Sequence, residues 1–433
     1  MRNQLQVKVW NAQALPANWF KRTRPLDESI ENNVKAIVNK VAKNGDAALI
    51  EFTEKFDKTK LKAESLRVTT EEIEEAYSMA SEEQLSALKL MKSKVSSLER
   101  LVLERIIFET SKDGIAVQNV LRPIESVGCY IPGGQAAYPS TVVMTAVPAK
   151  IAGVPRIVVC SPPTTKGTIN PLILVAADIC EVNEIYKVGG AQAIAALAYG
   201  TETIKPVKKI VGPGNKYVTM AKILVSNDVA IDMPAGPSEV LVLADETANP
   251  QLIALDMISQ AEHSADSVAG LITTSQKLAE EALFWLRKMA ASADRGIIVR
   301  KALADYGFVI TCKSVDEMVE LANVFAPEHV EIITRNPMEI ADRITSAGII
   351  LIGPYSPVSL SDYGSGTNHV LPTGGFGHAF SGLSALDFAR RVSIVESSRE
   401  GLLKVKNHVK VLTEAENLPN HYKAIEARFK DES

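Results

Sequence analysis

Residues 156–211 read RIVVCSPPTTKGTINPLILVAADICEVNEIYKVGGAQAIAALAYGTETIKPVKKIV and alternate between short apolar runs and helical stretches. We expect strands at residues 156–160, 184–188 and 209–211, with helices at residues 171–180 and up to Tyr199. Strand, helix, strand, helix, strand with short connections is typical of a parallel sheet with right-handed crossovers. The sequence therefore predicts an α/β fold.

A second alternation lies further along the chain, with strands at residues 240–243 and 268–273, a helix at about 249–263 and a last strand within residues 348–352. Before the sheets, residues 1–24 are polar and predict an extended arm, a helical pattern begins at Asp27, and a long charged helix runs from Thr70 towards Arg105. After a region rich in Gly, Pro and Ser, the chain closes with helices, one of them at residues 412–429.

Composition excludes several classes of protein. The 433 residues are 46% hydrophobic and 23% charged with a net charge of -4, which is ordinary for a globular protein. Basic residues form no patch of the kind a nucleic-acid partner requires, and no apolar stretch is long enough to span a membrane or act as a secretory signal. Four cysteines without a CxxC pair favour a reduced, cytoplasmic setting.

Three glycine-rich turns each connect a strand to a helix. They are GCYIPGG at 128–134, VGGAQA at 188–193 and VGPGNKY at 211–217. Glycine lets the backbone approach a ligand closely, and a helix start offers free amides to an anion. A single turn of this kind usually has only a structural role. Three on one sheet are equally compatible with a structural role and with binding of a nucleotide or another phosphate ligand. Ligands of open α/β sheets bind at these carboxyl ends of the strands.

Histidine is rare, and four of the six histidines lie in unusual polar segments. Gln260 and His263 share one face of a predicted helix, which fits either a zinc site or a structural polar patch. Glu328 and His329 follow Pro327 and open a new element, either as a general acid–base pair or as a helix start. His369 lies with Asp362 in a polar loop that is more typical of a site than of a linker. His421 near the C-terminus is either a ligand or a surface residue.

Taken together, these segments resemble the histidinol dehydrogenase family from about Leu121 to Ala427. The resemblance is carried by the phrases GCYIPGG, VGGAQAIAALAYGT, KIVGPGNKYV, IDMPAGPSEVLVLAD, SQAEH, FAPEHVEI, NHVLPTGG and AENLPNH. Ser361 and Thr367 depart from the family's usual glycine and proline, which can alter the loop that carries Asp362 and His369.

The resemblance implies a four-electron oxidation of L-histidinol to L-histidine, the last step of histidine biosynthesis. It implies that two NAD are reduced and that L-histidinaldehyde is held by the enzyme between the steps. It further implies a cytoplasmic homodimer with one zinc per subunit and an active site shared between subunits.

The resemblance also assigns residues. The zinc ligands would be Gln260, His263, Asp362 and, from the partner subunit, His421. Glu328 and His329 would be catalytic. Substrate would be bound by Ser238, His369 and Glu416 together with His329 and the four zinc ligands. NAD would be contacted by Tyr130, Gln192 and Asn215.

The residue types suit this chemistry. His329 can take the hydroxyl proton near neutral pH while hydride leaves, and Glu328 can activate the water that hydrates the aldehyde. Zinc would mainly orient the imidazole and amine of the substrate. A thiohemiacetal on Cys129 would be another way to hold the aldehyde, although the chemistry does not need it.

For the fold, we expect two Rossmann-like parallel-sheet domains, a small N-terminal arm and a helical C-terminal domain. The expected boundaries are 1–24 for the arm, 25–129 with 237–380 for the first α/β domain, 130–236 for the NAD-contacting α/β domain and 381–433 for the helical domain.

Three rival functions remain. A dehydrogenase for another small alcohol is the nearest, and the presence of every zinc and substrate position, including Glu416 and His421, speaks against it. A zinc hydrolase without a cofactor is disfavoured by the glycine turns and by the lack of HExxH. An inactive NAD-binding module is disfavoured by the intact Glu328 and His329.

Overall fold

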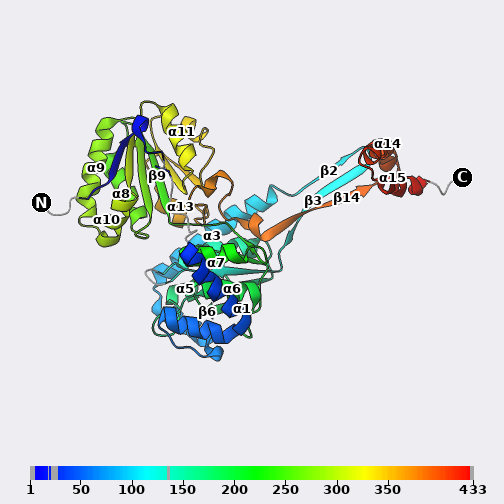
Figure 1. Cartoon of the computed structure of the whole chain (residues 1–433), viewed down its shortest axis with the longest axis horizontal. Coiled ribbons are helices and arrows are strands. Elements are labelled where there is room, and N and C mark those ends of the chain that lie inside the picture. The colour runs from blue at the N-terminus through cyan, green and yellow to red at the C-terminus, as the bar shows by residue number, and fades with distance from the viewer. Residues whose placement is uncertain (1–4, 18, 21–27, 134–136, 430–433) are drawn as a thin grey trace.

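The structure is a computed structural model that describes residues 5–17, 19–20, 28–133 and 137–429. Figure 1 shows two α/β units side by side and a long arm that projects from them and ends in helices. The predicted α/β class with two parallel sheets is confirmed.

The five-stranded parallel sheet has the order β6-β5-β4-β7-β8. Helices α4 and α5 pack on one of its faces and α6 and α7 on the other. The order of the strands reverses between β4 and β7, which is the point where open α/β sheets bind ligands. The bounds are β4 Ser126–Tyr130, α4 Pro139–Ile151, β5 Arg156–Ser161, α5 Pro171–Ile179, β6 Glu184–Lys187, α6 Gly190–Tyr199, β7 Lys209–Val211, α7 Lys216–Val225 and β8 Ala230–Ile231.

The six-stranded parallel sheet has the order β1-β11-β10-β9-β12-β13. Helices α8, α9 and α10 cover one face and α11 and α12 the other. Its order reverses between β9 and β12. The bounds are β9 Glu239–Ala244, α8 Pro250–Ala261, β10 Val268–Thr273, α9 Gln276–Ala290, α10 Gly296–Asp305, β11 Phe308–Thr311, α11 Val315–Phe325, β12 His329–Ile333, α12 Pro337–Ala341, β13 Ile349–Ile352 and α13 Val358–Tyr363.

The N-terminal segment is part of this second sheet. Strand β1, Lys8–Asn11, pairs in parallel with β11, and the ring of Trp10 stacks on Phe308 at 6.1 Å between centroids. The prediction of an extended arm missed this pairing. Strand β1 lies at the edge of the sheet, where a short polar strand can pair without an alternation of apolar and polar residues.

The first three helices pack on the five-stranded sheet, so the structure differs from the predicted grouping of 25–129 with 237–380. Helix α1, Glu28–Asp57, contacts α6 and α7, whereas α2, Thr70–Met79, and α3, Glu82–Glu104, contact α4 and α5. The single helix predicted from Thr70 is broken at Ala80, because Ser81 caps α3 by accepting a hydrogen bond from the Gln84 N–H.

The C-terminal region is not wholly helical. Strand β14, Ala389–Ser397, pairs antiparallel with β3, Ile115–Pro123, which also pairs with β2, Phe108–Lys112. This three-stranded sheet forms the arm in Figure 1, with α14, Arg399–Ala415, and α15, Pro419–Glu426, at its end. The helix predicted over residues 412–429 is interrupted because Asn417 has a left-handed φ of 57° and Pro419 starts a new helix.

The remaining elements are short 3-10 helices at Ala12–Ala14, Ala63–Ser65, Phe376–His378, Ala385–Phe388 and Ala427–Phe429. Strands β4, β9, β10 and β12 are buried along their whole length, as expected for parallel sheets covered on both faces. Across the described chain, no helix is both long and apolar enough to cross a membrane.

Candidate active site

The predicted catalytic pair lies at the amino ends of β9 and β12, where the order of the six-stranded sheet reverses. His329 is the first residue of β12 and pairs with Val240 of β9. Open α/β sheets usually bind ligands at the carboxyl ends of their strands, so the location differs from the general rule. The glycine turns of the other sheet do lie at carboxyl ends. The two edges approach each other at His369, whose Nε2 lies 3.3 Å from Oγ1 of Thr141 at the start of α4.

The local sequence explains why Glu328 and His329 open a strand. Helix α11 ends at Phe325, and Ala326 adopts a left-handed φ of 47°. Pro327 disfavours helix for the residue before it, so the chain leaves α11 and enters β12 at once. The interpretation of this pair as a helix start is therefore wrong, and its location at the start of a new element is confirmed.

The His329 imidazole is buried and surrounded by acceptors. Its Nδ1 lies 3.0 Å from the backbone oxygen of Glu239, which can only accept, so Nδ1 carries a proton and Nε2 faces the site. The Glu328 carboxylate lies 3.5 Å from Nδ1, and the Asp362 carboxylate lies 3.7 Å from Nε2. Burial disfavours the charged imidazole, but the two carboxylates outweigh it and raise the pKa of His329 to about 10.

Asp362 faces His329 from helix α13 and is 8% exposed. Burial opposes its ionisation, but the neighbouring His329, His369 and His263 outweigh burial and lower the pKa of the Asp362 carboxyl. Its Oδ1 is buried and has no hydrogen-bond donor among the described residues. The His329 Nε2, at 3.7 Å, lies beyond hydrogen-bond distance of this oxygen, so the oxygen is available to a cation or a donor from outside.

Glu239 holds Glu328 and His329 in place, and sequence reasoning missed it. Its backbone N–H donates to Oε2 of Glu328 at 2.8 Å, and its carboxylate accepts from the N–H groups of Glu328 at 3.3 Å and Gly374 at 3.0 Å. The side chain is 1% exposed. An acidic residue at the start of a fully apolar strand was the available signal, because an acid is rarely buried without partners.

A family model described as histidinol dehydrogenase matches residues 20–429. The chain belongs to the histidinol dehydrogenase family. Proteins named histidinol dehydrogenase are 44% identical over 411 residues in Methanothermobacter thermautotrophicus, covering 95% of this chain and 96% of the relative, and 47% identical over 401 residues in Clostridium acetobutylicum, covering 93% of each. The fold is similar to the crystal structure of histidinol dehydrogenase from Elizabethkingia anophelis, with a TM-score of 0.93, 38% identity and 98% of both chains covered. These matches confirm the resemblance and the prediction that the chain is a dehydrogenase.

Of the residues that the histidinol dehydrogenase resemblance assigns to zinc, Gln260 lies on α8, Asp362 lies on α13 and His263 lies just after α8. Gln260 is buried in the last turn of α8. His263 lies two residues after the end of that helix, and its backbone N–H donates to the backbone oxygen of Gln260 at 3.3 Å. His263 is close enough to Asp362 to affect its pKa. Ser238 lies just before β9, beside Glu239, and is half-buried.

The fourth assigned ligand is not brought to this site within one chain. His421 is exposed on α15, and Glu416 is exposed at the end of α14. Figure 1 shows both helices at the far end of the arm, away from the two sheets. Accordingly, no group of three His, Cys, Asp or Glu side chains able to hold a metal occurs in the described part of one chain.

The three residues assigned to NAD contacts lie at the carboxyl edge of the five-stranded sheet. Tyr130 ends β4, and its hydroxyl accepts a hydrogen bond from the Gly190 N–H at 3.1 Å. Gln192 is buried in the first turn of α6, and both polar atoms of its side chain lack a partner in the described chain. Asn215 caps α7, because its side-chain oxygen accepts a hydrogen bond from the Tyr217 N–H at 3.0 Å. This is a structural role, and the residue is exposed to solvent.

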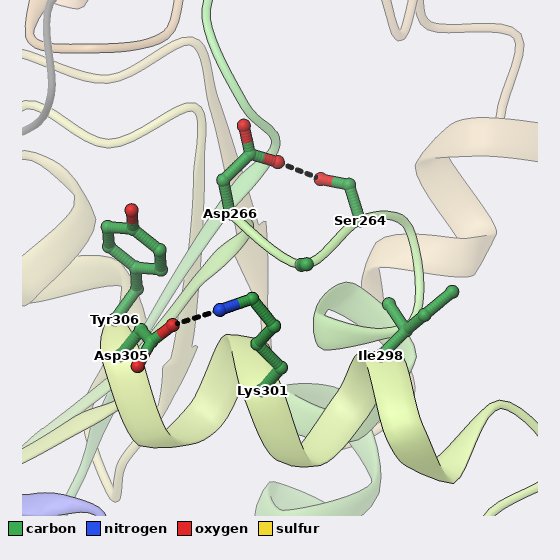
Figure 2. Close-up of a pocket in the computed structure, with 7 residues that line it drawn as sticks. Ser264, Asp266, Ile298, Lys301, Asp305 and Tyr306 are labelled. Atoms are coloured by element: carbon green, nitrogen blue, oxygen red, sulfur yellow. Dashed lines mark hydrogen bonds and ion pairs between the residues drawn. The ribbon is translucent and has the colours of Figure 1, made fainter.

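Two other features lie outside this site. Cys129 is fully buried, and burial raises the pKa of its thiol to about 12, so it does not supply the thiolate that a thiohemiacetal would need. Figure 2 shows a pocket of ≈ 400 Å³ beside α10, where Ser264 donates to Asp266 and Lys301 pairs with Asp305. None of the predicted site residues lines that pocket.

Proposed function

We propose that this chain oxidises L-histidinol to L-histidine in two steps, through an enzyme-held L-histidinaldehyde, and reduces two NAD. This is the last step of histidine biosynthesis, and a cytoplasmic location stays a prediction. The observation that carries the proposal is the buried His329 imidazole held between Glu328 and Asp362 in a chain of the histidinol dehydrogenase family.

The catalytic pair has the geometry for two proton transfers. Nε2 of His329 faces the site while Nδ1 is fixed on the Glu239 backbone, so this histidine is oriented to take the hydroxyl proton of an alcohol. Glu328 keeps one carboxylate oxygen on the Glu239 N–H and can use the other to activate water for aldehyde hydration. NAD, when bound, supplies the hydride acceptor for each oxidation.

The donor set fits zinc, one ion per subunit. Gln260, His263 and Asp362 offer an amide oxygen, an imidazole and a carboxylate whose Oδ1 lacks a donor. A cation held there would orient the imidazole and amine of the substrate. It would also offset the Asp362 charge beside His329 and favour the neutral imidazole that a base requires.

A homodimer would complete the site. Glu416 and His421 lie on the arm, apart from the donors of their own chain, so the arm of a second copy is the source that we propose for both. Ser238 and His369 would bind substrate from the chain that carries His329. Exposed apolar residues on the arm, such as Val395 and Leu412 at 63% and 61% exposure, support its burial against another chain.

The NAD site would lie on the glycine turns of the five-stranded sheet. Gly212 has a φ of 114°, and a Cβ at this position would lie 2.2 Å from the backbone oxygen of Tyr130, so only glycine fits this turn. The unpaired amide of Gln192 offers a donor and an acceptor to a dinucleotide at the same edge.

The test is the amount of NADH formed per L-histidinol consumed by zinc-loaded protein, with an EDTA-stripped control. Two NADH per substrate, lost on stripping and restored by zinc, supports the proposal. One NADH with released aldehyde shows that the second step fails and points to Glu328. No NADH would favour the rival function, a dehydrogenase for another small alcohol.

A further inference from the structure

Two carboxyl groups beneath the site, one buried and one half-buried, have no part in the proposed mechanism. Glu331 lies on β12 and is 1% exposed, within a strand whose other members after His329 are Val, Ile and Ile. Asp256 lies on α8 and is half-buried. A carboxyl group in such a strand costs free energy unless it is paired, so its partners indicate what it does.

Glu331 connects three elements. Its Oε1 accepts from the backbone N–H of Val358, the first residue of α13, at 2.7 Å. Its Oε2 is buried and accepts from no N–H or hydroxyl group of the described chain. The Asp256 carboxyl is close enough to interact with the Glu331 carboxyl. Two carboxylates make a hydrogen bond only when they share a proton. Burial and the neighbouring carboxyl raise the pKa of Glu331, and burial raises that of Asp256, which favours such a shared proton.

Each of the three elements carries part of the active site. Asp256 lies one helical turn before Gln260 on α8, and Val358 lies about one turn before Asp362 on α13. Glu331 lies two residues after His329 on β12, so the two side chains point to the same face of the sheet.

We propose that Glu331 and Asp256 are positioning residues, which hold α8 and α13 at a fixed separation from β12. Their link sets the spacing between the donors on the two helices and the base on the strand. This inference rests on the proposed metal site, because it predicts what happens to metal affinity when the link is broken. Groups that orient metal ligands from outside the coordination shell typically change affinity by roughly 10- to 100-fold when removed.

The chain offers matched variants. In Glu331→Gln the amide oxygen can accept from Val358 while the amide NH₂ donates to Asp256, so both contacts survive without a shared proton. Glu331→Met keeps the volume and loses both contacts. Glu99→Met is the control, because Glu99 is also buried and accepts from a backbone N–H, that of Ala385 at 2.6 Å, on the other α/β unit. Asp362→Asn tests the metal site itself.

The experiment measures Zn²⁺ affinity of each purified full-length variant by competition with a chromophoric chelator, together with the visible absorption of the Co²⁺-substituted protein. We expect Glu331→Met to lose roughly tenfold or more in Zn²⁺ affinity and to shift the Co²⁺ bands, with Glu331→Gln within about threefold of the unmodified chain. Glu99→Met should lose thermal stability and keep its Zn²⁺ affinity.

The outcomes separate the two proposals. If Asp362→Asn weakens Zn²⁺ binding but Glu331→Met does not, the positioning role is overturned and the metal site stands. If Asp362→Asn binds Zn²⁺ as tightly as the unmodified chain, the proposed metal site fails and the inference fails with it. Should Glu331→Met not fold, Asp256→Leu at the half-buried end of the link replaces it, with the same expected loss and the same overturning result.

Discussion

The role of Glu239 leads to a prediction that the structure makes quantitative. Both carboxylate oxygens accept backbone N–H groups, from Gly374 at 3.0 Å and from Glu328 at 3.3 Å, in a fully buried environment. In Glu239→Gln only one side-chain atom remains an acceptor. The shorter bond to Gly374 is expected to survive, so the amide NH₂ will face the N–H of Glu328.

The magnitude follows from the groups left unpaired. The variant buries one backbone N–H and one amide NH₂ without acceptors, at about 1–3 kcal/mol for each buried unsatisfied group. For the two groups together, we therefore expect the free energy of unfolding to fall by about 2–6 kcal/mol. Because the displaced N–H belongs to Glu328, the proposed catalytic carboxylate, kcat should also fall roughly 10- to 100-fold, as expected for a small misplacement of a reacting group.

Urea unfolding and steady-state NADH formation measure the two effects. Glu262→Gln is the matched control, because it makes the same change at an exposed residue near the end of α8. A Glu239→Gln chain that is within about 0.5 kcal/mol of the unmodified chain, with unchanged kcat, would refute the assigned hydrogen-bond geometry.

Other buried groups give three further predictions. Cys129→Ala should keep turnover within about twofold, and the native thiol should resist iodoacetamide, because burial raises its pKa to about 12; a large loss of turnover would contradict an inert thiol. Burial raises the pKa of Glu99 from 4.5 to about 7 in the fold, so its contribution to stability is fully present below about pH 4.5 and is lost as pH rises through 7. In the unmodified chain, the free energy of unfolding should therefore fall by up to about 3 kcal/mol between pH 4 and pH 8 through this group, and in Glu99→Gln this fall should be absent. If the two free energies of unfolding change with pH in the same way, the prediction is wrong. Lys222 forms a buried ion pair with Asp232 beneath the VGPGN turn, so Lys222→Met should cost about 3–5 kcal/mol in thermal or urea unfolding, whereas a loss below 1 kcal/mol would mean that the pair is not desolvated.

The sequence predicted the parallel sheets well because their strands are buried on both faces. Apolar runs such as those of β5 and β9 are followed by turn residues. Helices α5 and α6 begin at Pro171 and Gly190, and α7 begins after its cap Asn215. The three glycine turns were predicted from the same pattern, because the position of a strand-to-helix turn follows directly from the strands. The assignment of Tyr130, Gln192 and Asn215 to NAD came from the family resemblance and stays a prediction.

The arm was missed because its strands do not have a buried face within one chain. Strand β14 is exposed along nearly its whole length, and its sequence RRVSIVES has no clean alternation. Its pairing with β3, more than 250 residues earlier, depends on a contact that no local pattern encodes. The grouping of α1 with the wrong sheet has a related cause, because an amphipathic helix shows which face is apolar and not which sheet that face covers.

Within the site, the histidines were easier to predict than the carboxylates that hold them. His263, His329 and His369 stood out because histidine is rare in this chain. Glu239 and Glu331 are isolated acids in apolar strands, which is a signal for a buried, paired carboxylate. Their partners come from loops and helices distant in sequence, so local spacing did not indicate what these carboxylates hold.

The most direct test of the shared active site is complementation between two inactive variants. His329→Asn and His421→Leu chains are mixed, dissociated and reassembled, and NADH formation from L-histidinol is measured. If the arm of one chain completes the site of the other, each mixed dimer has one intact site, and random mixing restores about a quarter of the unmodified activity. Activity that stays at the level of the separate variants would contradict a site built from two chains.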